Sequence, residues 1–232
     1  MEKNSAGQGS HGRGLGDPVN EFEIRLNLSK VALGEVPPDT VITNAHLFNS
    51  ITREFIKRQS IWIKGDRVAY VGPDHHFAKN QKTQVIDANG MVILPGLIEG
   101  HTHSVGNKYG IEEFVKHVIP TGVTTVVTEV METGTISGKD GIQYPVRGFE
   151  GQPIRFYYTI QPLCGIKPSE EVMAPKNEAL IPFLEDPKCL GIGEIYWGNI
   201  FLEGEQGERV KDLIAIALRM GKLVEGHTTG AS

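Results

Sequence analysis

The chain has 232 residues, of which 39% are hydrophobic and 22% charged. This composition is typical of a soluble globular protein and excludes wholesale disorder, collagen and coiled coil. The net charge of −5, without a long basic run, argues against nucleic acid as a partner. Two cysteines cannot form a disulfide framework, and neither a secretory signal nor a bilayer-spanning apolar stretch is present. We therefore expect a cytoplasmic protein that binds neither nucleic acid nor membrane. The sequence is compatible with a homo-oligomer.

The beginning of the chain predicts a disordered tail over residues 1–20. Residues 1–17 contain five glycines and little apolar matter. The apolar positions in residues 20–34 predict a helix, although their early alternation also allows a strand. Pro37 and Pro38 then end that element.

Short β-rich runs follow and predict a sheet module that completes residues 21–95. One run covers residues 41–48. Two more, at 60–64 and 67–71, flank Gly65-Asp66 and predict a hairpin. A second turn signal at 88–90 separates two further runs. We expect a small antiparallel, β-sandwich-like sheet, which is marginal alone and should pack on something else.

Residues 96–232 alternate between strand and helix patterns, which predicts parallel βα units and an α/β fold. The five predicted strands are residues 97–101, 123–128, 154–160, 189–195 and 222–227. The predicted helices lie at 111–119, 177–184 and 209–220. The connection at 136–148 is rich in glycine and contains a proline, so a full helix there is doubtful. Because a complete (β/α) TIM barrel needs about 250 residues, we expect an incomplete barrel with about five of the eight strands.

Side chains of the types that can bind a metal ion lie at the C-terminal ends of three of these strands. His101 and His103 have the i, i+2 spacing that places two imidazoles on one face of a strand. Glu194 and His227 end two later strands. Each signal alone has a plainer interpretation: a surface His pair, an ion-paired carboxylate, or a structural histidine. Since active sites of parallel barrels lie at the C-terminal ends of the strands, their joint occurrence predicts a site for Zn, Mn or Fe.

Other polar residues carry weaker signals. Glu129 and Glu132 follow the second barrel strand and are candidates for substrate binding, with solvent-facing carboxylates as the alternative. Cys164 follows the third strand and could touch substrate, but it has no evident base partner and is not proposed as a nucleophile. Cys189 is expected to be a buried apolar filler, and His75 to be exposed.

Residues 92–103 (VILPGLIEGHTH) resemble the first-strand signature of the amidohydrolase superfamily. Within that superfamily the chain is most similar to the adenine deaminases. Similar stretches cover nearly the whole chain, from about residue 22 to residue 232; they include 31–35, 40–45, 118–127, 186–194 and 225–230.

The resemblance implies roles for the same four residues. His101 and His103 correspond to ligands of the first metal, and His227 to the fifth-strand histidine ligand. Glu194 corresponds to the carboxylate that bridges two metals and is the expected catalytic residue; hydantoinase-like and dihydroorotase-like relatives generally have a carboxylated lysine there. The implied protein is a metal-dependent deaminase with one or two divalent ions. Its substrate would be a small molecule, a purine base such as adenine or a similar cyclic amidine or amide, and it would release ammonia.

The chain departs from the family pattern in three places. Residues 104–106 replace the usual Glu-Ser-Ser, and residues 129–132 (EVME) replace Asp-Pro-His-Glu, so the purine-reading pocket is expected to differ. The sixth-strand histidine and the eighth-strand aspartate have no counterpart. We therefore expect a fragment with weak or absent catalysis on its own. Two alternatives stay open: an amidohydrolase for another cyclic amide or imine, and an inert truncated binding module.

Overall fold

The computed structural model describes residues 18–104, 109–162 and 175–229. The chain divides into two compact units, Met1–Pro95 and Gly96–Ser232, and each is described by itself. Most of the predicted tail lies outside the described residues. Helix α1 spans Pro18–Ala32, so residues 18–20, which we assigned to the tail, are helical. The amide groups of the first helical turn have no partner within the helix, so a proline at this position, which lacks an N–H, loses no hydrogen bond. Pro18 is therefore a favourable first residue of the helix. Within the described ranges no helix is long and apolar enough to cross a membrane.

The first unit contains a five-stranded sheet in which β1 (Thr40–Asn49), β2 (Glu54–Lys64) and β3 (Arg67–Pro73) are antiparallel. The predicted hairpin is present, because Lys64 pairs with Arg67 across Gly65-Asp66. Gly65 has a φ of +58°, a left-handed conformation that glycine adopts without strain.

The remaining strands of this sheet are parallel to β1, so the prediction of a wholly antiparallel module is wrong. Strands β4 (Gln84–Asp87) and β5 (Val92–Ile93) both pair with β1. Between them Asn89 and Gly90 have φ values of 48° and 74°. Gly90 N donates to the carbonyl of Asn44 at 2.8 Å. The turn therefore carries the chain further along the same edge of β1 and does not reverse it.

The core of the first unit forms around Trp62, which is fully buried. Its ring lies 4.6 Å from that of Tyr70 and 5.1 Å from that of Phe77, between ring centroids. The indole Nε1 donates a 2.9 Å hydrogen bond to Ser60 Oγ, so the buried polar atom is satisfied. His75 is exposed, as expected, and its ring also packs 4.4 Å from Trp62.

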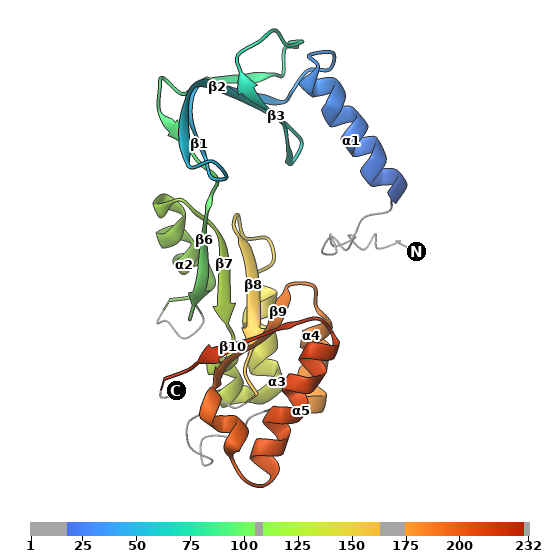
Figure 1. The fold of residues 1–232 in the computed structure, drawn as a ribbon, viewed down its shortest axis with the longest axis vertical. Helices are drawn as coiled ribbons and strands as arrows, with labels where there is room; N and C mark the ends of the chain where they lie inside the picture. Colours follow the sequence, from blue (N-terminus) through green and yellow to red (C-terminus); the bar gives the residue numbers. More distant parts are fainter. Residues whose placement is uncertain (1–17, 105–108, 163–174, 230–232) are drawn as a thin grey trace, which may run out of the picture. The chain divides into compact units, whose positions relative to one another are not determined.

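The second unit contains five parallel strands in the order β10-β9-β8-β7-β6, which form a curled half-barrel (Figure 1). This confirms the predicted α/β fold with five barrel strands. The strands are β6 (Leu97–Thr102), β7 (Val123–Glu129), β8 (Arg155–Ile160), β9 (Cys189–Tyr196) and β10 (Leu223–His227). The helical elements are α2 (Ile111–Val118), η1 (Ile119–Thr121), α3 (Met131–Gly148), α4 (Asn177–Glu185), η3 (Trp197–Phe201) and α5 (Glu205–Arg219).

Helix α3 occupies the connection in which a helix was doubtful. It is divided by a kink at Ser137 and Gly138, whose backbones are not helical. Gly138 has a φ of 60° and a ψ of −136°, which only glycine adopts readily. The glycines therefore do interrupt the regular helix, but they produce a kink between two helical segments and not a loop.

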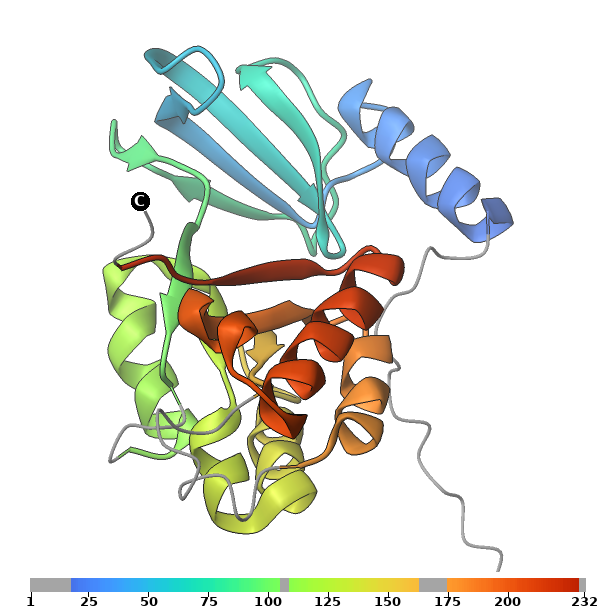
Figure 2. The same ribbon diagram turned by 60° about the horizontal axis from the view of Figure 1, so that its bottom comes forward.

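One hydrophobic core joins this sheet to its helices. It includes a buried residue from each helix, Val115, Ile142, Leu180 and Leu213, together with residues of β7, β8 and β9. Helices α4 and α5 lie side by side in both views (Figures 1 and 2). Cys189 is 1% exposed, as expected for an apolar filler, and burial raises the pKa of its thiol to about 12. Because the five strands are parallel and pair in this order, their C-terminal ends lie along one edge of the sheet.

Candidate metal centre

The structure brings the four predicted ligands together at the C-terminal ends of three strands. His101 lies near the end of β6 and His103 directly follows that strand. Glu194 lies in the last part of β9, and His227 is the last residue of β10. The parallel sheet brings these ends together although the residues are far apart in sequence.

Three imidazoles converge on the Glu194 carboxylate. Oε1 of Glu194 lies 2.9 Å from Nε2 of His101 and 3.1 Å from Nε2 of His227. Its Oε2 lies 3.7 Å from Nε2 of His103. The two Nε2 atoms of His101 and His103 are 3.4 Å apart. His101, His103 and Glu194 thus offer ligand atoms within 4.8 Å of one another.

This donor set fits a divalent cation. The imidazole nitrogens and carboxylate oxygens are ligands that Zn, Mn and Fe accept. The histidines are 40–45% exposed and Glu194 is 13% exposed, so the cluster is open on its histidine side. Two buried carboxylate oxygens in the described region, Glu132 Oε2 and Glu225 Oε1, have no hydrogen-bond partner. Buried oxygens without partners are costly, and a nearby positive charge would offset that cost.

Glu129 and Glu132 contact His103 from its other side. Nδ1 of His103 lies 2.7 Å from Glu132 Oε1 and 3.4 Å from Glu129 Oε2. The Glu129 side chain is 3% exposed, and burial, helped by the neighbouring carboxylates, raises its pKa to about 9. Near pH 7, without a bound cation, Glu129 is therefore a neutral acid.

Glu225 belongs to the same site but was missed by sequence reasoning. It precedes His227 by two residues on β10, so period-2 geometry places both side chains on one face. Burial raises the pKa of Glu225, while the charge of His101 lowers it and that of Glu194 raises it. The i, i+2 spacing to His227 was the signal that could have identified it.

Two further contacts restrain the candidate ligands. The ring of Tyr196 stacks on that of His227, with centroids 4.9 Å apart and an interplanar angle of 15°. Directly after His103, the buried Ser104 is tied to the next strand: its amide and its Oγ lie 3.1 Å and 2.7 Å from Thr128 Oγ1. No sequence pattern indicated these contacts, because each depends on the register between strands.

Gly191 and Gly193, the two glycines of β9, allow β10 to approach closely. A Cβ at Gly191 would overlap the carbonyl oxygen of Leu223 and would lie 2.7 Å from its backbone N and C. At Gly193 the space of a Cβ is taken by the Glu225 side chain. These glycines therefore allow β10 to bring Glu225 and His227 next to Glu194.

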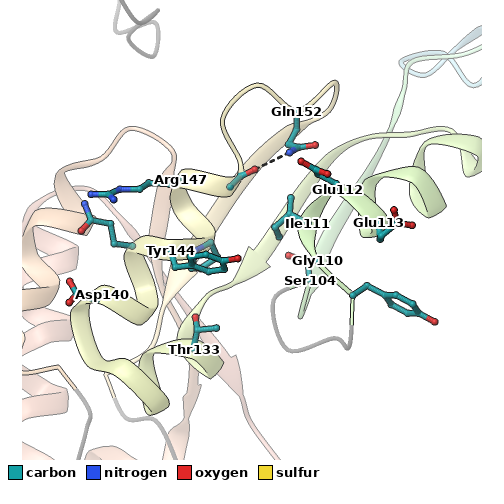
Figure 3. Close-up of a pocket in the computed structure, with 14 residues that line it drawn as sticks. Ser104, Gly110, Ile111, Glu112, Glu113, Thr133, Asp140, Tyr144, Arg147 and Gln152 are labelled. Atoms are coloured by element: carbon teal, nitrogen blue, oxygen red, sulfur yellow. Dashed lines mark hydrogen bonds between the residues drawn. The ribbon is translucent and has the colours of Figure 1, made fainter.

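A separate cavity of about 760 Å³ lies between α2 and α3 (Figure 3). Ser104, Glu112, Glu113, Tyr144 and Arg147 are among the residues that line it. None of the four candidate ligands does. We therefore place the candidate centre at the strand ends, where the ligand atoms converge, and not in this cavity. Cys164, considered for substrate contact, lies outside the described residues.

The chain is similar in sequence to proteins named adenine deaminase, which confirms the resemblance seen in its motifs. It is 32% identical to that of Ruegeria sp. (strain TM1040) over 207 residues, which cover 88% of this chain and 34% of the relative. It is also 32% identical to that of Bacillus velezensis over 211 residues, covering 90% of this chain and 34% of the relative. The chain therefore spans about a third of the length of these curated relatives. No family model matches it.

Solved structures support the fold. An atrazine chlorohydrolase from Arthrobacter aurescens TC1, crystallised with zinc, superposes with a TM-score of 0.51 at 16% identity, covering 80% of this chain and 52% of that chain. A triazine hydrolase gives a TM-score of 0.50 at 16% identity, covering 80% of this chain and 51% of that chain. At this identity the likeness concerns the barrel fold alone.

Proposed function

We propose that this chain contributes the metal centre of a metal-dependent hydrolase that deaminates a purine base, adenine or a close analogue. The observation that carries the proposal is the convergence of three imidazole Nε2 atoms on the Glu194 carboxylate at the strand ends. The similarity to adenine deaminases supports the choice of reaction. Hydrolytic deamination consumes one water and releases one ammonia, while a ring carbonyl replaces the amino group.

In this proposal His101, His103, Glu194 and His227 hold one or two divalent ions, with Zn, Mn or Fe as candidates. When bound, such an ion would polarise a water molecule and make it a better nucleophile near neutral pH. The histidines would hold the ion through Nε2, the atoms that face Glu194. Glu194 has two carboxylate oxygens directed at these nitrogens, which suits a bridging ligand.

The surrounding carboxyl groups would handle protons and substrate. Glu194, the proposed catalytic residue, would act through the ions it holds; the proton that moves as the amino group leaves would need a carboxyl group outside the ligand set. Glu129, whose pKa is raised to about 9 by burial, is placed beside His103 to contact the substrate, and its protonated form could donate a hydrogen bond to a ring nitrogen. The interpretation of Glu129 and Glu132 as substrate-binding residues stays a prediction.

The changes at residues 104–106 and 129–132 favour a second candidate, a hydrolase of the same fold acting on another cyclic amide or imine. Of the described residues in these segments, Glu129 and Glu132 lie beside Nδ1 of His103, so a change there alters the surroundings of that histidine. The metal centre is common to both candidates, so metal binding alone does not separate them.

The test has two parts. The first is titration of the 232-residue chain with Mn²⁺ or Zn²⁺; we expect binding that is lost in Glu194→Gln and retained in Glu178→Gln, whose exposed carboxylate on α4 lies outside the site. The second measures ammonia release from a panel of purines and cyclic amides by the full gene product. Release from adenine supports the proposal, whereas turnover of cyclic amides alone would favour the second candidate. Absence of metal binding would refute both.

A further inference from the structure

Among the three histidines of the candidate centre, His103 has a distinctive partner at its second ring nitrogen. Its Nδ1 lies 2.7 Å from Glu132 Oε1. For His101 and His227, the described residues place no carboxylate within ion-pair distance of Nδ1; both meet Glu194 through Nε2. Glu132 lies in the first turn of α3, 29 positions after His103.

We infer that Glu132 is a positioning residue that fixes the tautomer and ring orientation of His103 for metal binding. An ionised carboxylate only accepts hydrogen bonds, so Nδ1 of His103 must donate. In a neutral imidazole, a hydrogen on Nδ1 leaves the lone pair on Nε2. That Nε2 is the atom directed toward His101 and Glu194. The inference rests on the metal centre of the proposed function.

Glu132, and not Glu129, has the geometry for this role. Its 2.7 Å distance falls within the range of a charge-assisted hydrogen bond. Glu129 Oε2, at 3.4 Å from the same nitrogen, lies beyond the usual range of about 2.7–3.2 Å. Carboxylates that hydrogen-bond the second nitrogen of a metal-bound histidine also make it a more basic ligand.

The backbone at this point restrains the ring further. Ser104 is fully buried, and Thr128 Oγ1 accepts its amide hydrogen at 3.1 Å. The chain immediately after His103 is thus anchored to β7, whose last residue is Glu129. Helix α3, which carries Glu132, begins two residues after β7. Backbone and side chain therefore hold His103 from the same neighbouring βα unit.

The experiment compares Glu132→Ala, Glu132→Gln and the control Glu178→Ala in the 232-residue chain. Mn²⁺ or Zn²⁺ affinity is measured by competition with a chromophoric chelator. Loss of a carboxylate partner of a metal-bound histidine typically weakens metal affinity about 10–100-fold. We expect a loss of this size in Glu132→Ala without a change in stoichiometry, a smaller loss in Glu132→Gln, whose amide oxygen still accepts a hydrogen bond, and no change in Glu178→Ala.

A spectroscopic measurement separates positioning from a general structural effect. In the metal-free chain, ¹⁵N NMR of the imidazoles should show His103 with hydrogen on Nδ1 in the parent and in Glu132→Gln, and a tautomer mixture in Glu132→Ala. Unchanged affinity in Glu132→Ala would overturn the inference. A lower stoichiometry would overturn it too, since Glu132 would then be a direct ligand. If the parent chain binds no divalent ion, the proposed function fails as well, whereas normal parent binding with an unaffected Glu132→Ala removes this inference alone.

Discussion

The close approach of β9 and β10 at Gly191 predicts that an added methyl group destabilises the second unit. In Gly191→Ala the new Cβ would overlap the carbonyl oxygen of Leu223 and would lie 2.7 Å from both its backbone N and C. Carbon atoms in contact prefer separations of about 3.5–4.0 Å. Leu223 is paired with Gly191 in the parallel ladder, so its backbone cannot rotate away as a side chain would. The strands must separate locally, and their hydrogen bonds must lengthen.

Overpacking of this kind costs typically about 1–3 kcal/mol. Because rigid backbone opposes the methyl group, we expect the upper half of that range, about 2–3 kcal/mol. With about 2–4 °C per kcal/mol for chains of this size, the melting temperature of Gly191→Ala should fall by roughly 4–12 °C. Urea unfolding followed by circular dichroism measures the free energy. Hydrogen exchange of peptides from β9 and β10 then locates the loss.

Gly198→Ala is the matched control. Gly198 lies in η3, shortly after β9, and its added Cβ would meet no atom within 4 Å. Its free energy of unfolding should stay within about 0.5 kcal/mol of the parent value. If Gly191→Ala unfolds like Gly198→Ala, and exchange in β10 is unchanged, the strands are not as close as the structure has them. The explanation of the glycines given above would then be wrong.

Three further predictions concern the centre and the two cores. Saturation with Mn²⁺ at about 100 times its dissociation constant should stabilise the chain by about 2.7 kcal/mol, and a chelator or Glu194→Gln should remove that gain in thermal unfolding. Trp62→Ala should lower the free energy of urea unfolding by about 3–5 kcal/mol, while Ile51→Ala, at a 90% exposed site, should stay within about 0.5 kcal/mol. Burial raises the pKa of Cys189 from 9.0 to about 12, so the thiol ionises at lower pH in the unfolded chain than in the folded chain. The stability that this group contributes should therefore be full below pH 9 and fall between pH 9 and 12. Cys189→Ala should lose that pH dependence in urea titrations. A parent chain equally stable at pH 8.5 and 11 relative to Cys189→Ala would contradict it.

The candidate centre could be located from the sequence because two simple geometries combine there. Period 2 places His101 and His103 on one face, and parallel βα units bring all strand ends to one edge. Glu194 and His227 follow from the same rule. Glu225 obeys it as well, since it precedes His227 by two residues, but a single acidic residue within a strand pattern did not attract attention.

The parts that could not be predicted depend on contacts between distant segments. The pattern of 84–87 and 91–94 around a turn is compatible with a hairpin, and only the pairing of both strands with β1 shows that the chain continues along one edge. Residues 136–148 likewise form a helix divided by a kink at Gly138, where the glycine content argued against a continuous helix. The glycine-containing segments correctly predicted where the chain bends, but the direction in which it continues is decided by pairing with distant strands.

The departures from the adenine deaminase pattern divide according to what each residue touches. Of the motif that follows the second barrel strand, the last Glu is retained as Glu132, and Glu132 is the carboxylate 2.7 Å from Nδ1 of His103. The first position keeps a carboxyl group but lengthens from Asp to Glu129, whose pKa burial raises to about 9 in the metal-free chain. The histidine position, occupied by Met131, loses its imidazole. In the proposals made above, a chain altered in this way would retain the carboxylate that orients His103 and would change the groups that contact the substrate. Metal affinity and substrate preference should therefore respond to different substitutions: Glu132→Ala in metal titrations, and Glu129→Asp in the ratio of adenine to cyclic amide turnover.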